Sequence, residues 1–495
     1  MNVKSTLIAL LAVAAAACTP RGDYRNAIPA DAAMVVSADL PSLAEKSGLA
    51  GENGRELVQS LSAMMKSELK GYETLVDEIV KNPSESGLDL TSAAYLFSEA
   101  HAKRVGVLLR VGDEAKLERL LQALAGKGVC PSPSDGDGCR YVAMGRGLAA
   151  YTPDAFLVLV QDRTGDASAL LHPASMLLRN TGEDGFTATG AFRRMEEKTN
   201  DVVMYYNLDI LPVDAGAVKM GWPADVNLKD IQQLATVDFE SGRAVLDAVS
   251  LTDSTVWKKL YGNYTYTFRP LDGTYLDKLP RNAPLCWMVN TLGTEMYDCL
   301  SANTLLRNML ANPMMPVDIE RIIKSVKGDV AVALTDLNTL GFVLYADVTD
   351  KAFMQEFEHL KTLAALSNGR LKVSPAGADA YQLKYTAMAL PVTLWVGVKD
   401  NRLCVTNKPE LFHAAAPAQT LRDAEWAGQV PGKTLSLSVN LAAFAEMLAA
   451  GGQNLPMLAA LDYATVQSPD GLTVHMEVVA KDRGKNILET LFPLK

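Results

Sequence analysis

Two stretches of this 495-residue chain repeat one pattern: IPADAAMVVSAD at residues 28–39 and LPRNAPLCWMVN at residues 279–290. Each begins with an apolar residue and a proline, passes through variable residues and an alanine, and enters an apolar run that ends on Asp39 or Asn290. A short apolar run next to turn residues is typical of a buried strand. The same strand present twice indicates a duplicated domain.

Four further pairs of segments repeat in the same order along the chain: 105–124 with 340–360, 156–162 with 394–400, 203–211 with 435–444, and 235–250 with 464–479. Together with the opening pair they make five repeated segments, and the two copies of each segment are 229 to 251 residues apart. Units this long indicate paired domains, because the units of solenoid proteins are much shorter. We therefore predict a first repeat domain, a connecting segment and a second repeat domain at 28–262, 263–278 and 279–495.

Each half alternates stretches of period two with stretches of period 3.6, which indicates strands mixed with helices. Segments 235–250 and 464–479 each contain two alternating runs around Gly242 or Gly471, the pattern of a β-hairpin. The sequence lacks the glycine-rich crossover of a doubly wound nucleotide-binding fold. The predicted fold class is α+β, with two tandem related domains, each a largely antiparallel sheet with helices packed on it.

The N-terminus places an apolar run at 7–17 after the positive charge of Lys4 and directly before Cys18. This run is shorter than the ~20 residues that span a bilayer, so residues 1–17 are predicted to be a signal peptide. A cysteine after small residues resembles the lipobox of bacterial lipoproteins, which makes Cys18 the predicted lipid carrier and sole membrane attachment. Residues 18–27 would then be a tether. The alternative is a secreted protein with a chance cysteine.

Composition describes a folded protein with an acidic surface: 48% hydrophobic residues, 21% charged residues and a formal net charge of -10. A disordered chain has fewer apolar residues and more charge. The negative charge argues against nucleic acid as a partner and against electrostatic docking on anionic lipid. Asp23 is the one acidic residue just behind Cys18, which favours the periplasmic face of the outer membrane over the outer surface.

Five cysteines remain when Cys18 is set aside. Cys130 and Cys139 flank the turn-rich segment PSPSDGDG, and we predict a possible disulfide between them. Closing so small a loop would stabilise the fold by roughly 2–3 kcal/mol in the entropy model. The sequence leaves the pairing of the other three open: Cys286, Cys299 and Cys404.

Motifs that carry chemistry are absent from the sequence. It contains no nucleophile elbow, no phosphate-binding loop and no closely spaced histidine or cysteine pairs, so we predict no metal and no cofactor. A catalytic triad built from distant residues remains open, because geometry rather than spacing defines it. Four polar residues that end apolar runs are interpreted as helix N-caps rather than ligands: Asp39, Asn207, Asn290 and Asn440.

The segment that joins the halves contains an aromatic alternation, with Tyr264, Tyr266 and Phe268 on one face of an extended chain. Aromatic side chains supply a large contact area with a polar tip, so this face is a possible partner surface for a sugar or a protein. The alternative is that the three rings pack one half against the other.

With the Cys18 motif, the 28–39 strand and its second copy, the chain resembles the Bacteroidetes lipoproteins of roughly 500 residues known only as a domain of unknown function. The resemblance implies an envelope location and brings no activity or catalytic residue. We expect a lipid-anchored envelope protein that acts as a non-enzymatic binding or interaction module for an envelope protein or glycan. One alternative is a glycan- or peptidoglycan-directed hydrolase with carboxylates in the inter-domain cleft. Another is a purely structural lipoprotein.

Overall fold

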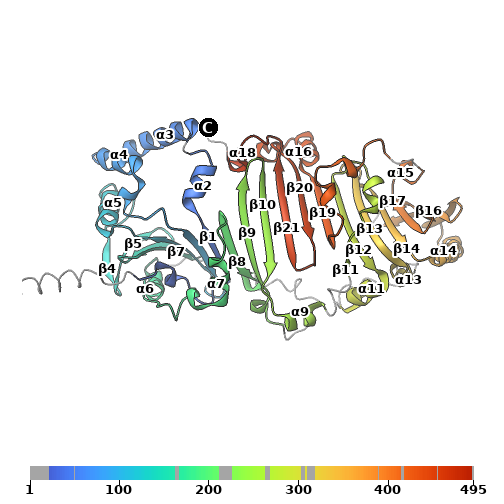
Figure 1. Ribbon diagram of the computed structural model, residues 1–495, viewed down its shortest axis with the longest axis horizontal. Coiled ribbons are helices and arrows are strands. Elements are labelled where there is room, and N and C mark those ends of the chain that lie inside the picture. The colour runs from blue at the N-terminus through green and yellow to red at the C-terminus, as the bar shows by residue number, and fades with distance from the viewer. Residues whose placement is uncertain are drawn as a thin grey trace, which may run out of the picture. The chain divides into compact units, whose positions relative to one another are not determined.

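The computed structural model describes residues 22–49, 51–161, 167–210, 226–261, 268–302, 307–308, 318–387, 390–413, 417–453 and 455–492. The chain divides into two compact units, Met1–Leu211 with Leu494–Lys495, and Pro212–Pro493. Figure 1 labels the helices and strands of both units, coloured along the chain from blue to red.

In the described part of the first unit, eight strands form one antiparallel sheet. Their spatial order is β8 (Val202–Asn207), β1 (Met34–Ala38), β2 (Ala94–Glu99), β3 (Arg104–Arg110), β7 (Ala155–Gln161), β6 (Gly147–Tyr151), β5 (Cys139–Met144) and β4 (Ser134–Gly136). The helices are α2 (Leu40–Lys46), α3 (Glu52–Glu68), α4 (Glu73–Lys81), α5 (Glu114–Gly126), α6 (Leu171–Leu178) and α7 (Gly190–Glu196). Helix α5 packs by its apolar spacing, since Leu117 and Leu121 are buried one turn apart.

The second unit contains a longer antiparallel sheet. Its spatial order is β9 (Gln232–Glu240), β10 (Arg243–Ser250), β21 (Thr473–Ala480), β20 (Leu461–Ser468), β19 (Leu435–Asn440), β12 (Leu285–Leu292), β13 (Val326–Asp336), β14 (Gly341–Val348), β18 (Arg402–Thr406), β17 (Leu390–Lys399), β16 (Ala380–Ala387) and β15 (Leu371–Gly377). The short strand β11 (Phe268–Arg269) pairs with the end of β12. The helices are α9 (Ser254–Tyr261), α11 (Gly293–Ala302), α13 (Ile319–Lys324), α14 (Gln355–Leu366), α15 (Pro409–His413), α16 (Leu441–Ala450), α17 (Pro456–Ala459) and α18 (Ile487–Leu491).

The two repeats use the same elements with the same pairings. Strands β1, β2, β3 and β7 pair with one another as β12, β13, β14 and β18 do, and helix α5 follows β3 as α14 follows β14. Strand β8 pairs with β1 as β19 pairs with β12. The predicted fold class is therefore confirmed: an α+β fold of two related antiparallel sheets with helices.

Both predicted hairpins are present, and they pair with each other. Strands β9 and β10 turn at Gly242 (φ 71°), while β20 and β21 turn at Gly471 (φ 79°), conformations that glycine adopts without strain. Strand β10 pairs antiparallel with its own repeat partner β21, and Asp247 lies opposite His475. The hairpin at 235–250 thus belongs to the second compact unit, although its sequence belongs to the first repeat.

The repeated structure begins earlier than the first matched strands. A 3₁₀ turn at Tyr24–Ala27 precedes β1, and a second at Thr274–Asp277 precedes β12. Tyr24 and Tyr275 stand at matching distances from the repeated prolines Pro29 and Pro280. The described part of the segment expected to be a tether is therefore folded onto the first unit.

Three of the four predicted N-caps are confirmed. Asp39 accepts a hydrogen bond from Ser42 N at 3.1 Å, Asn207 from Asp209 N at 3.0 Å, and Asn440 from Ala443 N at 3.0 Å.

The interpretation of Asn290 as a cap is wrong. Asn290 lies inside β12, which continues to Leu292, and its amide donates to the buried carboxylate of Asp329 at 2.9 Å. The reason is that β11 and β13 supply strand partners at this position, so the strand continues past the residue that was expected to end it.

Candidate functional site

One face of the sheet in the second unit carries a continuous row of apolar side chains. Six residues on β9, β10, β21, β20, β19 and β12 lie directly opposite one another in that order: Val237, Leu246, Met476, Val466, Leu437 and Trp287. All six are partly exposed. We call them the apolar row. Neighbouring strands lie about 4.8 Å apart, so five intervals make the row about 24 Å long.

The next row on the same face, two residues along each strand, is also uncharged. It consists of Phe239, Ala244, Val478, Ala464, Val439 and Leu285. Neither row contains a charged side chain. This surface was not identified by the sequence analysis, although the period-two alternation of β10 and β21 is visible in the sequence.

On the central strands β19 and β20 the opposite face is polar and buried. Ser436 and Thr465 are 0% exposed and Gln467 is 1% exposed. Ser436 Oγ, Thr465 Oγ1 and Gln467 Nε2 find no hydrogen-bond partner in the part of the chain that the structure describes. A sheet in water usually buries its apolar face and exposes its polar one. Here the polar face is the buried one, so the apolar row needs an explanation other than core packing.

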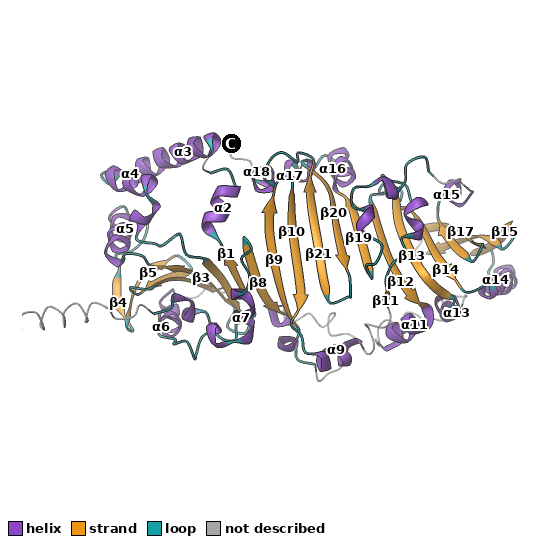
Figure 2. Ribbon diagram, in the orientation of Figure 1, coloured by secondary structure: helices purple, strands orange, loops and turns teal. Residues whose placement is uncertain are grey.

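Helices border the apolar row at both ends of the strands. At one end, helices α16, α17 and α18 and the second uncharged row share a small buried cluster of Leu461, Ala480 and Ile487. The residues packed against this cluster are Leu441, Leu458 and Leu491 of the helices and Phe239, Ala244 and Val478 of the row. At the other end, Trp257 Nε1 of α9 donates to Ser250 Oγ at 3.0 Å. Figure 2 shows α16 to α18 at one end of strands β9 to β19 and α9 at the other. Helices therefore lie at both ends of the strands that carry the two uncharged rows, and we call the two rows together the floor.

The first unit carries the same row in the same register. Its members are Met204, Val36, Leu96, Val107 and Val158, on β8, β1, β2, β3 and β7. The corresponding residues of the second unit are Leu437, Trp287, Val332, Leu344 and Val405. Val107 is 39% exposed and its neighbours Val105 and Val160 are 42% and 45% exposed. A row of partly exposed apolar side chains thus occupies the same register in both repeats.

The seam between β10 and β21 carries a line of charges on the polar face. Arg243 donates to Glu240 at 2.7 Å and to Glu477 at 3.0 Å, while His475 lies 2.8 Å from Asp247 and 3.5 Å from Glu477. The hydrogen bond to Glu240 raises the pKa of the Arg243 guanidinium. Acidic and basic side chains alternate along this line, so their hydrogen bonds and ion pairs connect β10 and β21 across the seam.

Buried carboxylates bear on the hydrolase alternative. In the described residues, four are buried, and each has a donor: Asp201 from Lys46, Glu99 from Arg104, Glu477 from Arg243, and Asp329 from two backbone N–H groups and Asn290. A general acid of a glycosidase needs an environment that favours the protonated form. All four of these carboxylates instead accept hydrogen bonds from cationic or N–H donors.

The structure describes five of the six cysteines, among them the predicted pair Cys130 and Cys139. Cys18 lies outside the described residues. Cys130 and Cys139 are free thiols in the structure, with their sulfurs against the carbonyls of Leu121 and Gly136 at 3.9 and 3.5 Å, and burial raises both thiol pKa values. Their pairing stays a prediction. Cys286 is fully buried, which raises its pKa to about 12.

The aromatic surface is placed only in part. Tyr264 and Tyr266 lie outside the described residues, whereas Phe268 is in β11 opposite Thr291 of β12 and is partly buried. The partner surface predicted for these three residues stays a prediction.

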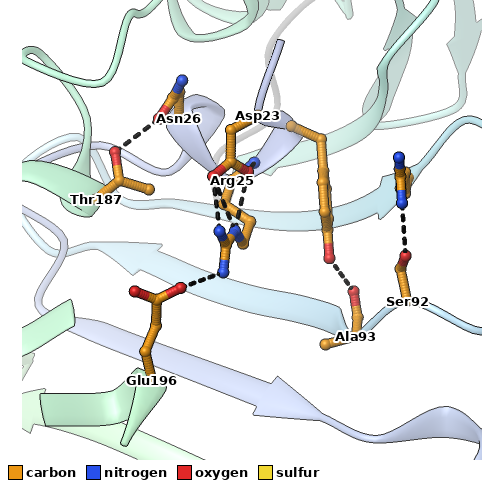
Figure 3. Close-up of polar contacts among 9 residues, drawn as sticks. Asp23, Arg25, Asn26, Ser92, Ala93, Thr187 and Glu196 are labelled. Atoms are coloured by element: carbon orange, nitrogen blue, oxygen red, sulfur yellow. Dashed lines mark hydrogen bonds and ion pairs between the residues drawn. The ribbon is translucent and has the colours of Figure 1, made fainter. Parts of the chain in front are cut away.

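The folded N-terminal segment is held by several side chains, shown in Figure 3. The Tyr24 hydroxyl donates to Ala93 O at 2.8 Å, and Arg25 bridges Asp23 and Glu196 at 2.7 and 2.6 Å. The Arg25 guanidinium also lies 5.0 Å from the centre of the Phe192 ring. This segment is therefore an integral part of the first unit from Tyr24 onwards.

The described residues contain neither a candidate metal site nor a candidate membrane-spanning helix. No group of three or more histidine, cysteine or acidic side chains is arranged to hold a metal ion. No described helix is both long enough and apolar enough to cross a bilayer.

A family model described as a domain of unknown function (DUF4836) matches residues 24–488. The chain belongs to this family. The match begins at Tyr24, the first residue of the opening 3₁₀ turn, so the family domain includes the folded N-terminal segment described above. No curated protein matches the chain.

Solved structures resemble the chain only weakly. Crystal forms I and IV of TP0453 each give a TM-score of 0.28, at 10% and 12% identity, covering 47% and 46% of this chain and 79% and 81% of theirs. The DNA polymerase III beta subunit from Thermotoga maritima gives a TM-score of 0.12 at 8% identity, covering 90% of this chain and 98% of that one. Similarity this low does not bear on function.

Proposed function

We propose that this protein is a lipid-anchored protein of the bacterial cell envelope that binds an apolar molecule on the apolar row and performs no chemistry on it. The observation that carries the proposal is the apolar row of the second unit: six apolar side chains remain partly exposed, while polar side chains of the central strands β19 and β20 are buried on the opposite face. Exposed apolar surface of this extent is characteristic of binding sites. The absence of unpaired buried carboxylates in the described residues supports a binding role over hydrolysis.

The proposed anchor is the lipid on Cys18, as in the Bacteroidetes lipoproteins that the sequence resembles. We place it in the outer membrane, facing the periplasm. Tyr24, the first residue of the 3₁₀ turn that belongs to the first unit, lies six residues after Cys18. A fully extended chain of this length spans about 20 Å. A first unit attached in this way stays close to the membrane surface, within reach of the acyl chains and lipoproteins of the envelope.

Replacing Cys18 by serine is expected to abolish acyl labelling and move the protein from the membrane to the soluble fraction. The physical reason is that lipid attachment needs the thiol, and the hydroxyl of serine does not replace it. Metabolic labelling with a clickable fatty acid, followed by fractionation, measures both effects. Cys130→Ser is the matched control and should keep label and location. Continued membrane retention of unlabelled Cys18→Ser protein would refute the anchor.

The binding site is tested with the uncharged fluorophore Nile red and the unlipidated Cys18→Ser protein. We expect saturable binding that Met476→Glu weakens at least tenfold, because a carboxylate in the middle of the row must lose water when the ligand binds. Met176→Glu is the matched control, since Met176 is 52% exposed on α6, away from the row.

Leu246→Asn provides a second, uncharged change in the row, and circular dichroism checks that each variant is folded. Binding that is equal in Met476→Glu and Met176→Glu would show that the row is not the site. A wild-type protein that fails to bind the dye would overturn the proposed function itself.

A further inference from the structure

We infer that the ligand of the apolar row is a long aliphatic chain, such as the acyl chain of a lipid, laid across the strands of the second unit. This inference rests on the proposed function and names the chemical class of its ligand. It is drawn from the composition of the floor, its length and the elements that border it.

The composition of the floor excludes ligands that need polar partners. The apolar row and the row beside it contain only aliphatic side chains, Met476, Phe239 and Trp287, so the indole N–H is their one side-chain donor. A peptide lying extended on this floor would bring one N–H and one C=O per residue with nothing to accept or donate. Backbone pairing gives no help, because β10, β21, β20 and β19 are hydrogen-bonded to strands on both sides. An uncharged chain without hydrogen-bonding groups matches such a floor.

The length of the floor also fits. The six residues of the apolar row span about 24 Å. The same register continues through Val332 to Leu344 and Val405, where the side chains pack against a buried core cluster. An acyl chain that fills one leaflet of a bilayer is about 15 Å long, half of the ~30 Å hydrocarbon core. One such chain therefore fits within the row and crosses about four strands, with its polar head group at one end in contact with solvent.

The bordering helix α16 offers a second apolar surface. Its sequence LAAFAEMLAA contains one charged residue, Glu446, yet none of its residues is buried. Phe444 and Leu448 are partly exposed, although residues of this type usually lie in the interior. Because α16 packs against β20 of the floor, its partly exposed apolar side chains add to the apolar surface available to an aliphatic chain.

The test uses Trp287, which lies at the end of the apolar row, as a built-in fluorescent probe. Unlipidated Cys18→Ser protein is titrated with 18-carbon fatty acid brominated at carbons 9 and 10, because bromine quenches tryptophan only at close range. We expect saturable quenching, at least half of which is lost in Trp287→Phe. Trp395→Phe is the matched control: Trp395 lies on β17, four strands away from β12 in the sheet, so its removal should leave the quenching intact.

Chain length gives a second readout. A methylene that becomes fully buried strengthens binding about fourfold, so affinity should rise steadily from 8 to 16 carbons. A site for a head group or a flat aromatic molecule would show no such series.

Three outcomes would overturn the inference while leaving the proposed function in place: Nile red binding without quenching by the brominated chain, affinity independent of chain length, or a dimer in sedimentation that Met476→Glu dissociates. The last result would identify a second copy of the protein as the occupant. Loss of Nile red binding would instead remove the proposed function on which the inference depends.

Discussion

Asp329→Ala is expected to reduce the free energy of unfolding of the second unit by about 4 kcal/mol, the larger of the two stability effects we predict. Asp329 is 2% exposed, and its two oxygens accept from Asp272 N at 3.1 Å, Thr274 N at 3.0 Å and Asn290 Nδ2 at 2.9 Å. Alanine leaves three donors without an acceptor in the interior. Hydrogen bonds to a charged acceptor contribute about 1.5–3 kcal/mol each, and the sum is reduced because the loop can relax.

Urea unfolding followed by circular dichroism measures this effect. Asp329→Asn keeps one oxygen acceptor and should lose about half as much stability as alanine. Glu410→Ala, at an exposed position in the first turn of α15, is the matched control and should stay within about 0.5 kcal/mol of the wild type. A change below about 1 kcal/mol in Asp329→Ala would mean that water replaces the carboxylate and that this contact does not fix the start of the second repeat.

The features that sequence predicts well here are those with local causes. The hairpin turns at Gly242 and Gly471 need a positive φ, and the caps at Asp39 and Asn440 need a short acceptor before a helix, so each is visible within a few residues. Their recurrence in one order also revealed the duplication. The confirmed fold class follows from these local signals.

Asn290 shows why local signals fail at a distance. It has the sequence context of Asp39, yet its partner Asp329 lies 39 residues further along, in a strand whose register only the folded sheet defines. The first repeat has no acid at the matching place, because the residue before β2 is Ala93. The cap and the strand interior are therefore indistinguishable until the partner strand is known.

The apolar row was missed for a different reason. The period-two alternation of β19 and β20 places Leu437 and Val466 on one face and Ser436 and Gln467 on the other, but it does not indicate which face other parts of the chain bury. The usual assumption puts the aliphatic side chains inside and the hydroxyls outside. The structure has the opposite arrangement, which only the placement of the covering segments determines. Serine, threonine and glutamine recurring at period two in apolar strands were the available signal.

Gly106→Ala is expected to destabilise the first unit by about 2–3 kcal/mol through overpacking. Gly106 of β3 lies opposite Phe97 of β2, and the Phe97 ring, 0% exposed, covers the glycine. A methyl group added to Gly106 would stand 2.1 Å from the Phe97 ring, which is closer than any real carbon contact. The ring is enclosed in the core, so it cannot move aside without leaving a cavity elsewhere.

A double-mutant cycle with Phe97→Leu tests whether the ring is the cause. Phe97→Leu alone should cost about 1–2 kcal/mol because it leaves space, but combined with Gly106→Ala it should cost less than the sum of the two, since the methyl group fills that space. Gly190→Ala is the matched control: its added methyl group meets only the end of the Arg193 side chain at 3.9 Å, and alanine favours the helix that starts there. Additive losses in the urea midpoints would show that backbone strain, and not the ring, makes glycine necessary at position 106.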